Sequence, residues 1–337
     1  MNQLLSRGNV VELQGAPGTG KTRLVYDAVA TCILPKQASG LQLGGWGQAA
    51  FVLDTEDTFD IQCVHRLLCA RLDRAFRTDD TVQLKDDLDQ ARATTVEEAL
   101  RNLHVFRPAS STQLAATILQ LPYYHHEEPY IQNCEFGLLV VDSMSSFYWQ
   151  DRFTTEQLRG GPSEARTPFR HVLTAIERIK TSHRPTILLT NWGLNPLVKD
   201  PALADTSPFF RQHLYPTPAG FELSAPHQPA HEFGSRATMG EYSRRATPAH
   251  IAPEYEPIEA PARSLATLPL THHITLSRSP IMDPNEDFDT LQDKDTVVKS
   301  FEFVGRVRVP HDKTIAEFRF SVHEDRIDFE PNDMFRR

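Results

Sequence analysis

Long apolar runs are missing from this sequence. None reaches the length of a membrane-spanning helix, and the first residues lack the apolar core of a signal peptide. We therefore expect no association with a membrane. The four cysteines include no C-x-x-C pair, which argues against a disulfide framework or a zinc site. Three of them lie in apolar helical or strand patterns, so we interpret them as reduced core residues of an intracellular protein.

Positive charge is also scarce. The 337 residues carry a formal net charge of −9, and the sequence pI is near 5.9. Proteins that hold DNA on their own usually present a basic surface. Any DNA contact of this chain should therefore be local or shared with partner proteins. With 40% hydrophobic residues, the chain can form one large α/β domain or two smaller ones.

A phosphate-binding signature is present and complete. Residues Gly15–Thr22 fit the pattern G-x-x-x-x-G-K-[S/T] at every fixed position. The apolar run Val10–Leu13 before it predicts a strand, and the periodicity of Arg23–Leu34 after it predicts a helix. In this context, glycine N–H groups surround a polyphosphate, and the positive end of the helix faces the same charge. We predict that Lys21 reaches the β- and γ-phosphates of ATP and that the Thr22 hydroxyl binds Mg²⁺.

Strand and helix patterns alternate along most of the chain, which is typical of a mostly parallel sheet flanked by helices. Near the C-terminus, alternating polar and apolar residues instead predict antiparallel strands with one exposed face. We expect 77–95 to be a loop or helical insertion, 150–166 to be a loop, and Asp57-Thr58 to start a helix. The predicted later strands are Ala49–Glu56, Leu103–Phe106, Phe136–Asp142, Thr186–Asn191, Thr271–Ser277, Val297–Val309 and Ile315–Val322.

Composition divides the chain into three predicted parts. Residues 1–195 are expected to form the ATP-binding α/β core. Eleven of the 24 prolines lie between Pro196 and Pro261, where branched aliphatic residues are few. We therefore interpret 196–265 as a long, proline-rich and poorly ordered insertion. Residues 266–330 are expected to supply strands that complete the core sheet.

The acidic residues indicate which kind of P-loop protein this is. ATP hydrolysis needs one carboxylate to support Mg²⁺ and another to orient a water molecule. Asp142 ends the central strand and suits the metal, but serines follow it, so the acid pair of AAA-type ATPases is missing from that strand. Glu56 is the candidate catalytic residue, with Asp54 and Asp57 as competitors, and it could face the γ-phosphate if the second strand lies near the P-loop strand. The predicted ATP-binding residues are Gly15, Ala16, Pro17, Gly18, Thr19, Gly20, Lys21, Thr22 and Asp142, of which Thr22 and Asp142 form the predicted Mg²⁺ site.

Three stretches resemble the eukaryotic RecA-type recombinase paralogues: Thr31–Pro35, Leu53–Asp60 and Asp142–Arg152. The similarity covers residues 8–195 well and the C-terminal strands loosely. It implies a RecA-like P-loop ATPase core and a nuclear role in homologous recombination and double-strand-break repair. It also implies a heteromeric complex with other recombinase paralogues, which supports the main recombinase. Single-stranded or branched DNA would then be bound through that complex.

The sequence departs from this family in two places. The recombinases carry a glutamine after the Thr-Asn pair that ends the fifth strand, where it senses the γ-phosphate, whereas this chain has Trp192. An indole only donates hydrogen bonds, so tryptophan does not relay the nucleotide state in the same way. The loop after that strand, which binds DNA in the recombinases, coincides here with the proline-rich insertion. Only a short segment precedes the first strand, where many relatives carry a docking region.

Other interpretations remain open from the sequence alone. The chain could be a nucleotide-binding scaffold that never hydrolyses ATP. A small-molecule kinase would need an arginine-rich lid and an acceptor pocket, and the sequence supports neither. Arg152, Arg159 and Arg166 could contact phosphates or simply lie in a solvated loop. The adjacent pairs His125-His126 and His272-His273 are unsuited to a shared metal, because neighbouring side chains usually point apart.

Overall fold

A computed structural model describes residues 4–77, 85–157, 168–194, 268–278, 301–312 and 314–330, together with positions 210 and 214. Within these ranges the chain forms a nine-stranded sheet in the order β11-β10-β9-β8-β1-β7-β6-β4-β5 and a short β2–β3 hairpin. The strands are β1 (Val10–Gly15), β2 (Gln37–Ala38), β3 (Leu41–Gln42), β4 (Ala49–Asp54), β5 (Leu103–Phe106), β6 (Phe136–Asp142), β7 (Thr186–Trp192), β8 (His272–Arg278), β9 (Phe301–Arg308), β10 (Ala316–Val322) and β11 (Ile327–Phe329).

The six strands from β8 to β5 in this order are parallel to their neighbours, and β9, β10 and β11 continue the sheet in antiparallel fashion. β6 shows why the parallel half is stable. All seven of its residues are buried, and they alternate between two cores. Leu138 and Val140 belong to one core, whereas Leu139 and Val141 belong to the other. A strand buried on both faces therefore needs helices on both sides.

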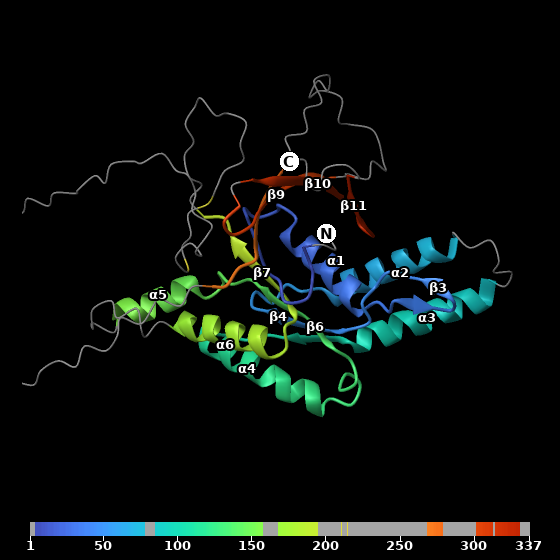
Figure 1. Cartoon of the computed structure of the whole chain (residues 1–337), viewed down its shortest axis with the longest axis horizontal. Helices are drawn as coiled ribbons and strands as arrows, with labels where there is room; N and C mark the ends of the chain where they lie inside the picture. The colour runs from blue at the N-terminus through green and yellow to red at the C-terminus, as the bar shows by residue number, and fades with distance from the viewer. Residues whose placement is uncertain are drawn as a thin grey trace, which may run out of the picture.

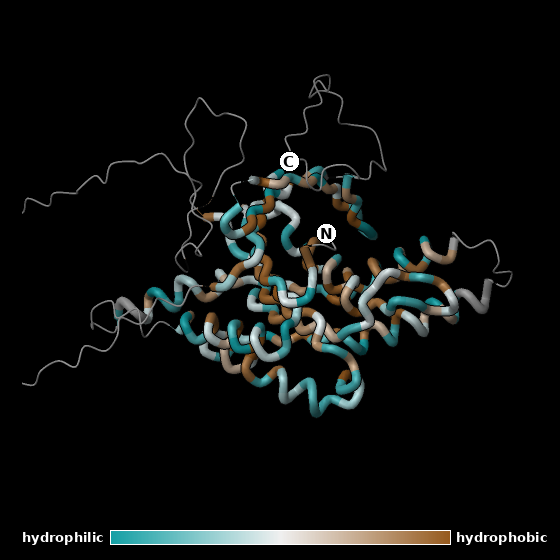
Figure 2. The backbone as a smooth tube through the Cα atoms, in the orientation of Figure 1, coloured by the Kyte–Doolittle hydropathy of each residue, from teal (hydrophilic) through white to brown (hydrophobic). Residues whose placement is uncertain are grey.

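Helices cover both faces of the parallel half (Figure 1). The core on one face includes residues of the first three helices, and the core on the other includes residues of α4 and α6. Figure 2 shows the apolar colour gathered along the strands and the inner sides of these helices. The helices are α1 (Lys21–Ile33), α2 (Ile61–Arg77), α3 (Lys85–Arg101), α4 (Ser111–Glu127), α5 (Tyr148–Gln157) and α6 (Pro168–Ser182). The chain therefore has the mixed α/β architecture of a RecA-like core.

The C-terminal strands extend the sheet on the side of the P-loop strand. β8 pairs in parallel with β1, so it belongs to the parallel half although 261 positions separate Val10 from Thr271, which exchange hydrogen bonds. β9 and β10 are antiparallel, as their alternating patterns predict, and Figure 1 shows them above α1. The insertion expected at 196–265 lies outside the described residues except for positions 210 and 214.

Two local predictions need correction. The predicted loop at 150–166 begins as a helix, because α5 runs to Gln157; residues 158–167 lie outside the described part. The polar segment at 77–95, for which a loop or a helical insertion was expected, is helical from Lys85. α2 begins at Ile61 and not at Asp57-Thr58, because the Asp54 carboxylate accepts the N–H groups of Thr58 and Phe59 in the preceding turn. Among the described residues, no helix combines the length and the apolar character that crossing a bilayer requires.

Candidate nucleotide site

The segment Ala16–Gly20 links the carboxyl end of β1 to the first turn of α1. Gly18 and Gly20 have φ angles of 74° and 86°, a conformation that glycine adopts without strain. A Cβ at Gly18 would find no atom within 4 Å, whereas a Cβ at Gly15 would come within 2.6 Å of the Thr19 hydroxyl. Glycines with positive φ let successive N–H groups converge on an anion, next to the positive end of a helix. The backbone of the predicted phosphate-binding loop is therefore compatible with anion binding.

Lys21 begins α1 and folds back over this loop. Its Nζ donates to the carbonyl oxygens of Gly15 (2.7 Å) and Ala16 (2.9 Å). Burial lowers the pKa of the Lys21 ammonium group, and the nearby carboxylates of Asp142 and Glu56 act in the opposite direction. The carboxylates of Asp142 and Glu56 are thus close enough to Lys21 to stabilise its positive charge. An ammonium group held by loop carbonyls can exchange them for phosphate oxygens.

Asp142 lies at the end of β6, where it is buried. The Thr190 hydroxyl at the end of β7 donates to its Oδ1. Burial raises the pKa of the Asp142 carboxyl, and the neighbouring Glu56 and Asp54 raise it further, whereas Thr190 and Lys21 lower it. A buried carboxylate beside other carboxylates favours a cation that neutralises them. The residues present are therefore suited to Mg²⁺, whose preferred ligands are oxygens.

The three acids that competed at the end of β4 have different positions. The Asp54 side chain is 1% exposed and accepts the N–H groups that organise the turn before α2. Asp57 is exposed and pairs with Arg107, whose Nε lies 2.8 Å from its Oδ1. Glu56 instead faces the ends of β6 and β7. Of the three acids, Glu56 is therefore the one that remains a candidate for the catalytic base.

Glu56 Oε1 accepts two hydrogen bonds, one from the Ser143 hydroxyl (2.6 Å) and one from the indole Nε1 of Trp192 (2.8 Å). The neighbouring Thr55 ties β4 to β6: its N–H donates to the Asp142 carbonyl (2.9 Å), and its hydroxyl donates to the Ser143 carbonyl (2.7 Å). The Asp142–Ser143 peptide bond is cis. Sequence reasoning named Trp192 only as a departure from the family. The structure shows that its indole holds the predicted catalytic carboxylate.

The strand order explains how these groups meet. β7 and β6 separate β4 from β1, so the second predicted strand is not the neighbour of the P-loop strand. Because all four strands are parallel, their carboxyl ends still share one edge of the sheet. Sequence reasoning missed Thr190 and Ser143. Two features of the sequence could have indicated them. Thr190 is a polar residue near the end of an apolar strand, and Ser143 is a hydroxyl residue directly after the predicted metal ligand Asp142.

The C-terminal strands also reach the phosphate-binding loop. A cavity of about 390 Å³ lies between the loop residues 18–23 and residues of β8, β9 and β10 with the turn that follows. A Cβ at Gly20 would come within 3.2 Å of the Phe320 ring. The cavity is lined on the C-terminal side by Arg278, Phe303, Val322, His323 and Glu324. Sequence analysis assigned these strands to the sheet but not to the site.

The other arginines and histidines named from the sequence lie away from this edge of the sheet or make other contacts. Arg152 is on α5, where its guanidinium lies 5.8 Å from the centre of the Trp149 ring. Arg159 and Arg166 are outside the described residues. His125 contacts the carbonyl of Cys134 (2.9 Å), and His273 pairs with Glu12 (2.8 Å), so one histidine of each pair is engaged away from its neighbour.

The loop, the lysine and the acids split between β4 and β6 define a P-loop nucleotide-binding domain of the RecA-like class. Comparison with known families agrees, because residues 1–191 match a family described as an AAA domain. The chain therefore belongs to this family, and within it the chain is similar to the RecA-like recombinase paralogues, XRCC2 among them.

Three curated relatives illustrate the similarity. DNA repair protein XRCC2 of Mus musculus is 31% identical over 189 residues, which cover 56% of this chain and 57% of the relative. The XRCC2 homolog of Arabidopsis thaliana is 29% identical over 166 residues, covering 45% and 44%. DNA repair protein RAD51 homolog 3 of Dictyostelium discoideum is 26% identical over 150 residues, covering 43% and 36%. The chain thus spans about half the length of the curated relatives it matches.

Proposed function

We propose that this protein is an ATP-binding recombinase-paralogue subunit that acts in DNA double-strand-break repair by homologous recombination. The observation that carries the proposal is the convergence of Lys21, Asp142 and Glu56 at one edge of the sheet, beside a complete phosphate-binding loop. The loop residues Gly15–Thr22 bind the phosphates. Thr22 and Asp142 hold Mg²⁺, which neutralises phosphate charge and positions the γ-phosphate.

Glu56 is the catalytic residue in this proposal. Its Oε1 is held by Ser143 and Trp192, so the carboxylate has a fixed orientation and its second oxygen can accept a hydrogen bond from the attacking water. Its position at the exposed edge also allows a partner subunit to cover the nucleotide and add a cation. Hydrolysis would then be slow in the isolated subunit and faster in a complex.

The wider role follows from the relatives named as DNA repair proteins. We propose that the protein works in the nucleus, in a heteromeric complex with other recombinase paralogues that supports the main strand-exchange recombinase. With a net charge of −9, it would contact single-stranded or branched DNA through that complex. We further propose residues 1–195 as the ATPase core, 196–265 as an insertion and 266–330 as the strands that complete the sheet.

A second candidate function is a nucleotide-binding scaffold that assembles the repair complex without hydrolysing ATP. The observation that favours it is Trp192, which occupies the position of the γ-phosphate-sensing glutamine and donates to Glu56. Both functions need ATP binding, and only the first needs turnover.

Binding of a fluorescent ATP analogue to the purified full chain, with and without Mg²⁺, tests the shared part of the proposal. Lys21→Ala should weaken binding about 10- to 100-fold, since a hydrogen bond to a charged group contributes about 1.5–3 kcal/mol. Lys180→Ala is the control, because Lys180 Nζ donates to the Pro269 carbonyl outside the loop. Equal affinities of the two variants would contradict the proposal.

Turnover and partners require a second experiment. The tagged protein is purified from cells, its partners are identified by mass spectrometry, and ATP hydrolysis of the complex is measured with and without DNA. Recombinase paralogues among the partners and turnover that Lys21→Ala removes would support the enzymatic function. Bound ATP without turnover would support the scaffold, and the absence of such partners would contradict the recombination role.

A further inference from the structure

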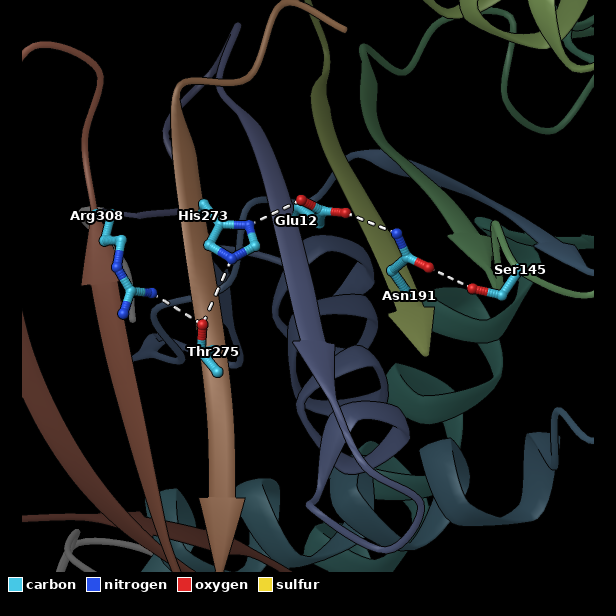
Figure 3. A network of polar contacts seen from close by, with 6 residues as sticks. All are labelled: Glu12, Ser145, Asn191, His273, Thr275 and Arg308. Atoms are coloured by element: carbon cyan, nitrogen blue, oxygen red, sulfur yellow. Dashed lines mark hydrogen bonds and ion pairs between the residues drawn. The ribbon is translucent and has the colours of Figure 1, made fainter. Parts of the chain in front are cut away.

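A chain of buried polar side chains crosses four strands of the sheet (Figure 3). Glu12 in the middle of β1 is fully buried, and it accepts hydrogen bonds from both sides. Nδ2 of Asn191 on β7 lies 2.9 Å from its Oε1, and Nδ1 of His273 on β8 lies 2.8 Å from its Oε2. The chain continues from His273 to the Thr275 hydroxyl (3.4 Å), which accepts from Arg308 on β9 (2.8 Å).

The other end of the chain leads to the candidate nucleotide site. The Ser145 hydroxyl donates to Oδ1 of Asn191 and accepts the backbone N–H of Trp192 (2.9 Å). The indole of Trp192 then donates to Glu56 (2.8 Å). A continuous hydrogen-bonded path therefore runs from the C-terminal antiparallel strands, through the P-loop strand, to the predicted catalytic carboxylate.

The groups along this path fix the direction of most of its bonds. An ionised carboxylate only accepts, and a guanidinium group or a backbone N–H only donates. Arg308 therefore donates to the Thr275 hydroxyl, and the N–H of Trp192 orients the Ser145 hydroxyl toward Asn191. Both arms deliver their last donor to Glu12. The direction of the bond between Thr275 and His273 depends on the tautomer of the imidazole. The Ser145 hydroxyl cannot rotate without breaking its bond to Asn191.

Such a network is costly for a core. Burial lowers the pKa of the Arg308 guanidinium, with a further effect of Arg306, which reflects the penalty for a buried charge. Replacement of buried ion pairs by apolar residues is often neutral or stabilising, so stability alone does not account for this network. We argue instead that the network fixes the position of the half-buried Trp192 at the end of the path.

We propose that Glu12, Asn191 and Ser145 are positioning residues that hold Trp192 against Glu56, and that β8 and β9 anchor the far end of this path. This inference rests on the proposed role of Glu56. A displacement of the C-terminal strands would release Asn191 and Ser145 in turn and change the orientation of the indole. The C-terminal strands thereby set the orientation of the catalytic carboxylate from the opposite side of the P-loop strand.

Fluorescence of Trp192 tests the proposal without nucleotide. The full chain has three tryptophans, so a Trp46→Phe/Trp149→Phe background leaves Trp192 as the reporter. Because loss of one hydrogen bond shifts a local equilibrium by a factor of about five, Ser145→Ala should make acrylamide quenching of Trp192 about twofold stronger. Glu12→Leu should act in the same direction, whereas Glu12→Gln keeps an acceptor for Asn191 and should restore the parent value.

Thr186→Val is the matched control. It removes a buried hydroxyl from the other end of β7, where Thr186 donates to the carbonyls of Leu5 and Ser6. Quenching that is unchanged in Ser145→Ala, or increased equally in Thr186→Val, would overturn the proposal. If the Ser145→Ala variant does not fold, Glu12→Leu provides a second measurement of the same effect.

In the complex, Ser145→Ala should lower kcat about fivefold and leave KM unchanged.

A chain that binds no ATP would contradict the proposed function and leave the fluorescence result valid. Conversely, normal binding and turnover with unchanged quenching would overturn only the positioning role. The two proposals therefore fail separately.

Discussion

The two sides of the nucleotide site are built in different ways. The phosphate side comes from one continuous segment, Gly15–Thr22, whose glycine φ angles and helix start follow from its own residues. The acidic side is assembled from the ends of β4, β6 and β7, with Glu56, Asp142 and Trp192 separated by up to 136 positions. A contiguous motif can be recognised from sequence, whereas an assembled one depends on strand order.

The two sides should also fail differently when mutated. In the proposed function the phosphate side provides binding, so its variants should lose affinity. On the acidic side Glu56 positions water, so its variants should lose rate and keep affinity, whereas Asp142 holds Mg²⁺, so its variants should lose Mg²⁺-dependent binding. Three further predictions test this difference, starting with the largest expected effect.

Glu56→Gln should reduce kcat for ATP hydrolysis about 100-fold or more while ATP affinity stays within about twofold, because general-base catalysis contributes about 10²–10⁴-fold. Glutamine keeps an acceptor oxygen for Ser143 and Trp192, so the local structure should be retained. Single-turnover hydrolysis by the purified complex measures the effect. Asp57→Asn is the control, because Asp57 is exposed and paired with Arg107. Similar rates for the two variants would remove Glu56 from the catalytic role.

Gly20→Ala should lower the melting temperature more than Gly18→Ala. Both residues have positive φ, and the left-handed conformation costs an alanine about 1–2 kcal/mol. Only at Gly20 would the new Cβ press on Phe320, at 3.2 Å, whereas Gly18 faces open space. The shared cost should lower Tm by about 2–4 °C per kcal/mol, with an additional fall for Gly20→Ala. Equal shifts in nucleotide-free thermal unfolding would show that the C-terminal strands do not restrain the loop.

Asp142→Asn should raise Tm slightly at neutral pH in the absence of Mg²⁺ and ATP. Burial raises the pKa of the Asp142 carboxyl above 3.8, so the folded state favours the protonated form. The stability linked to this protonation is complete below pH 3.8 and is lost as pH rises through the folded pKa. The advantage of asparagine should therefore appear above that pKa and vanish in acid, while Mg²⁺-dependent ATP binding is lost. Calorimetry between pH 3 and 8 measures the difference, and an advantage that grows in acid would contradict it.

Sequence analysis predicted the fold class because the parallel strands are recognisable one by one. Phe136–Asp142 is buried at every position and has the predicted bounds. Two helix boundaries were predicted wrongly, one of them because a side chain before the helix binds the N–H groups that would have begun it. The Asp54 carboxylate delays α2 to Ile61, and α5 occupies part of the expected 150–166 loop.

The contacts among the candidate site residues could not be predicted from the sequence. Glu56 was one of three acids at a strand end, and only the position of β4 beside β6 separates it from Asp54 and Asp57. The partner of Trp192 could not be predicted, because an indole side chain alone does not indicate which carboxylate it reaches. The same holds for Phe320 beside Gly20, two residues that are 300 positions apart in the sequence.

The sequence alone predicts the backbone of the Gly15–Thr22 loop, since glycines that tolerate positive φ and a following helix are local properties of eight residues. It also predicts the parallel core and the doubly buried strand Phe136–Asp142. The contacts of Glu56 with Ser143 and Trp192 and the pairing of β8 with β1 are visible only in the folded chain. These depend on the order and register of strands, which arise from long-range packing of two cores and not from any single segment.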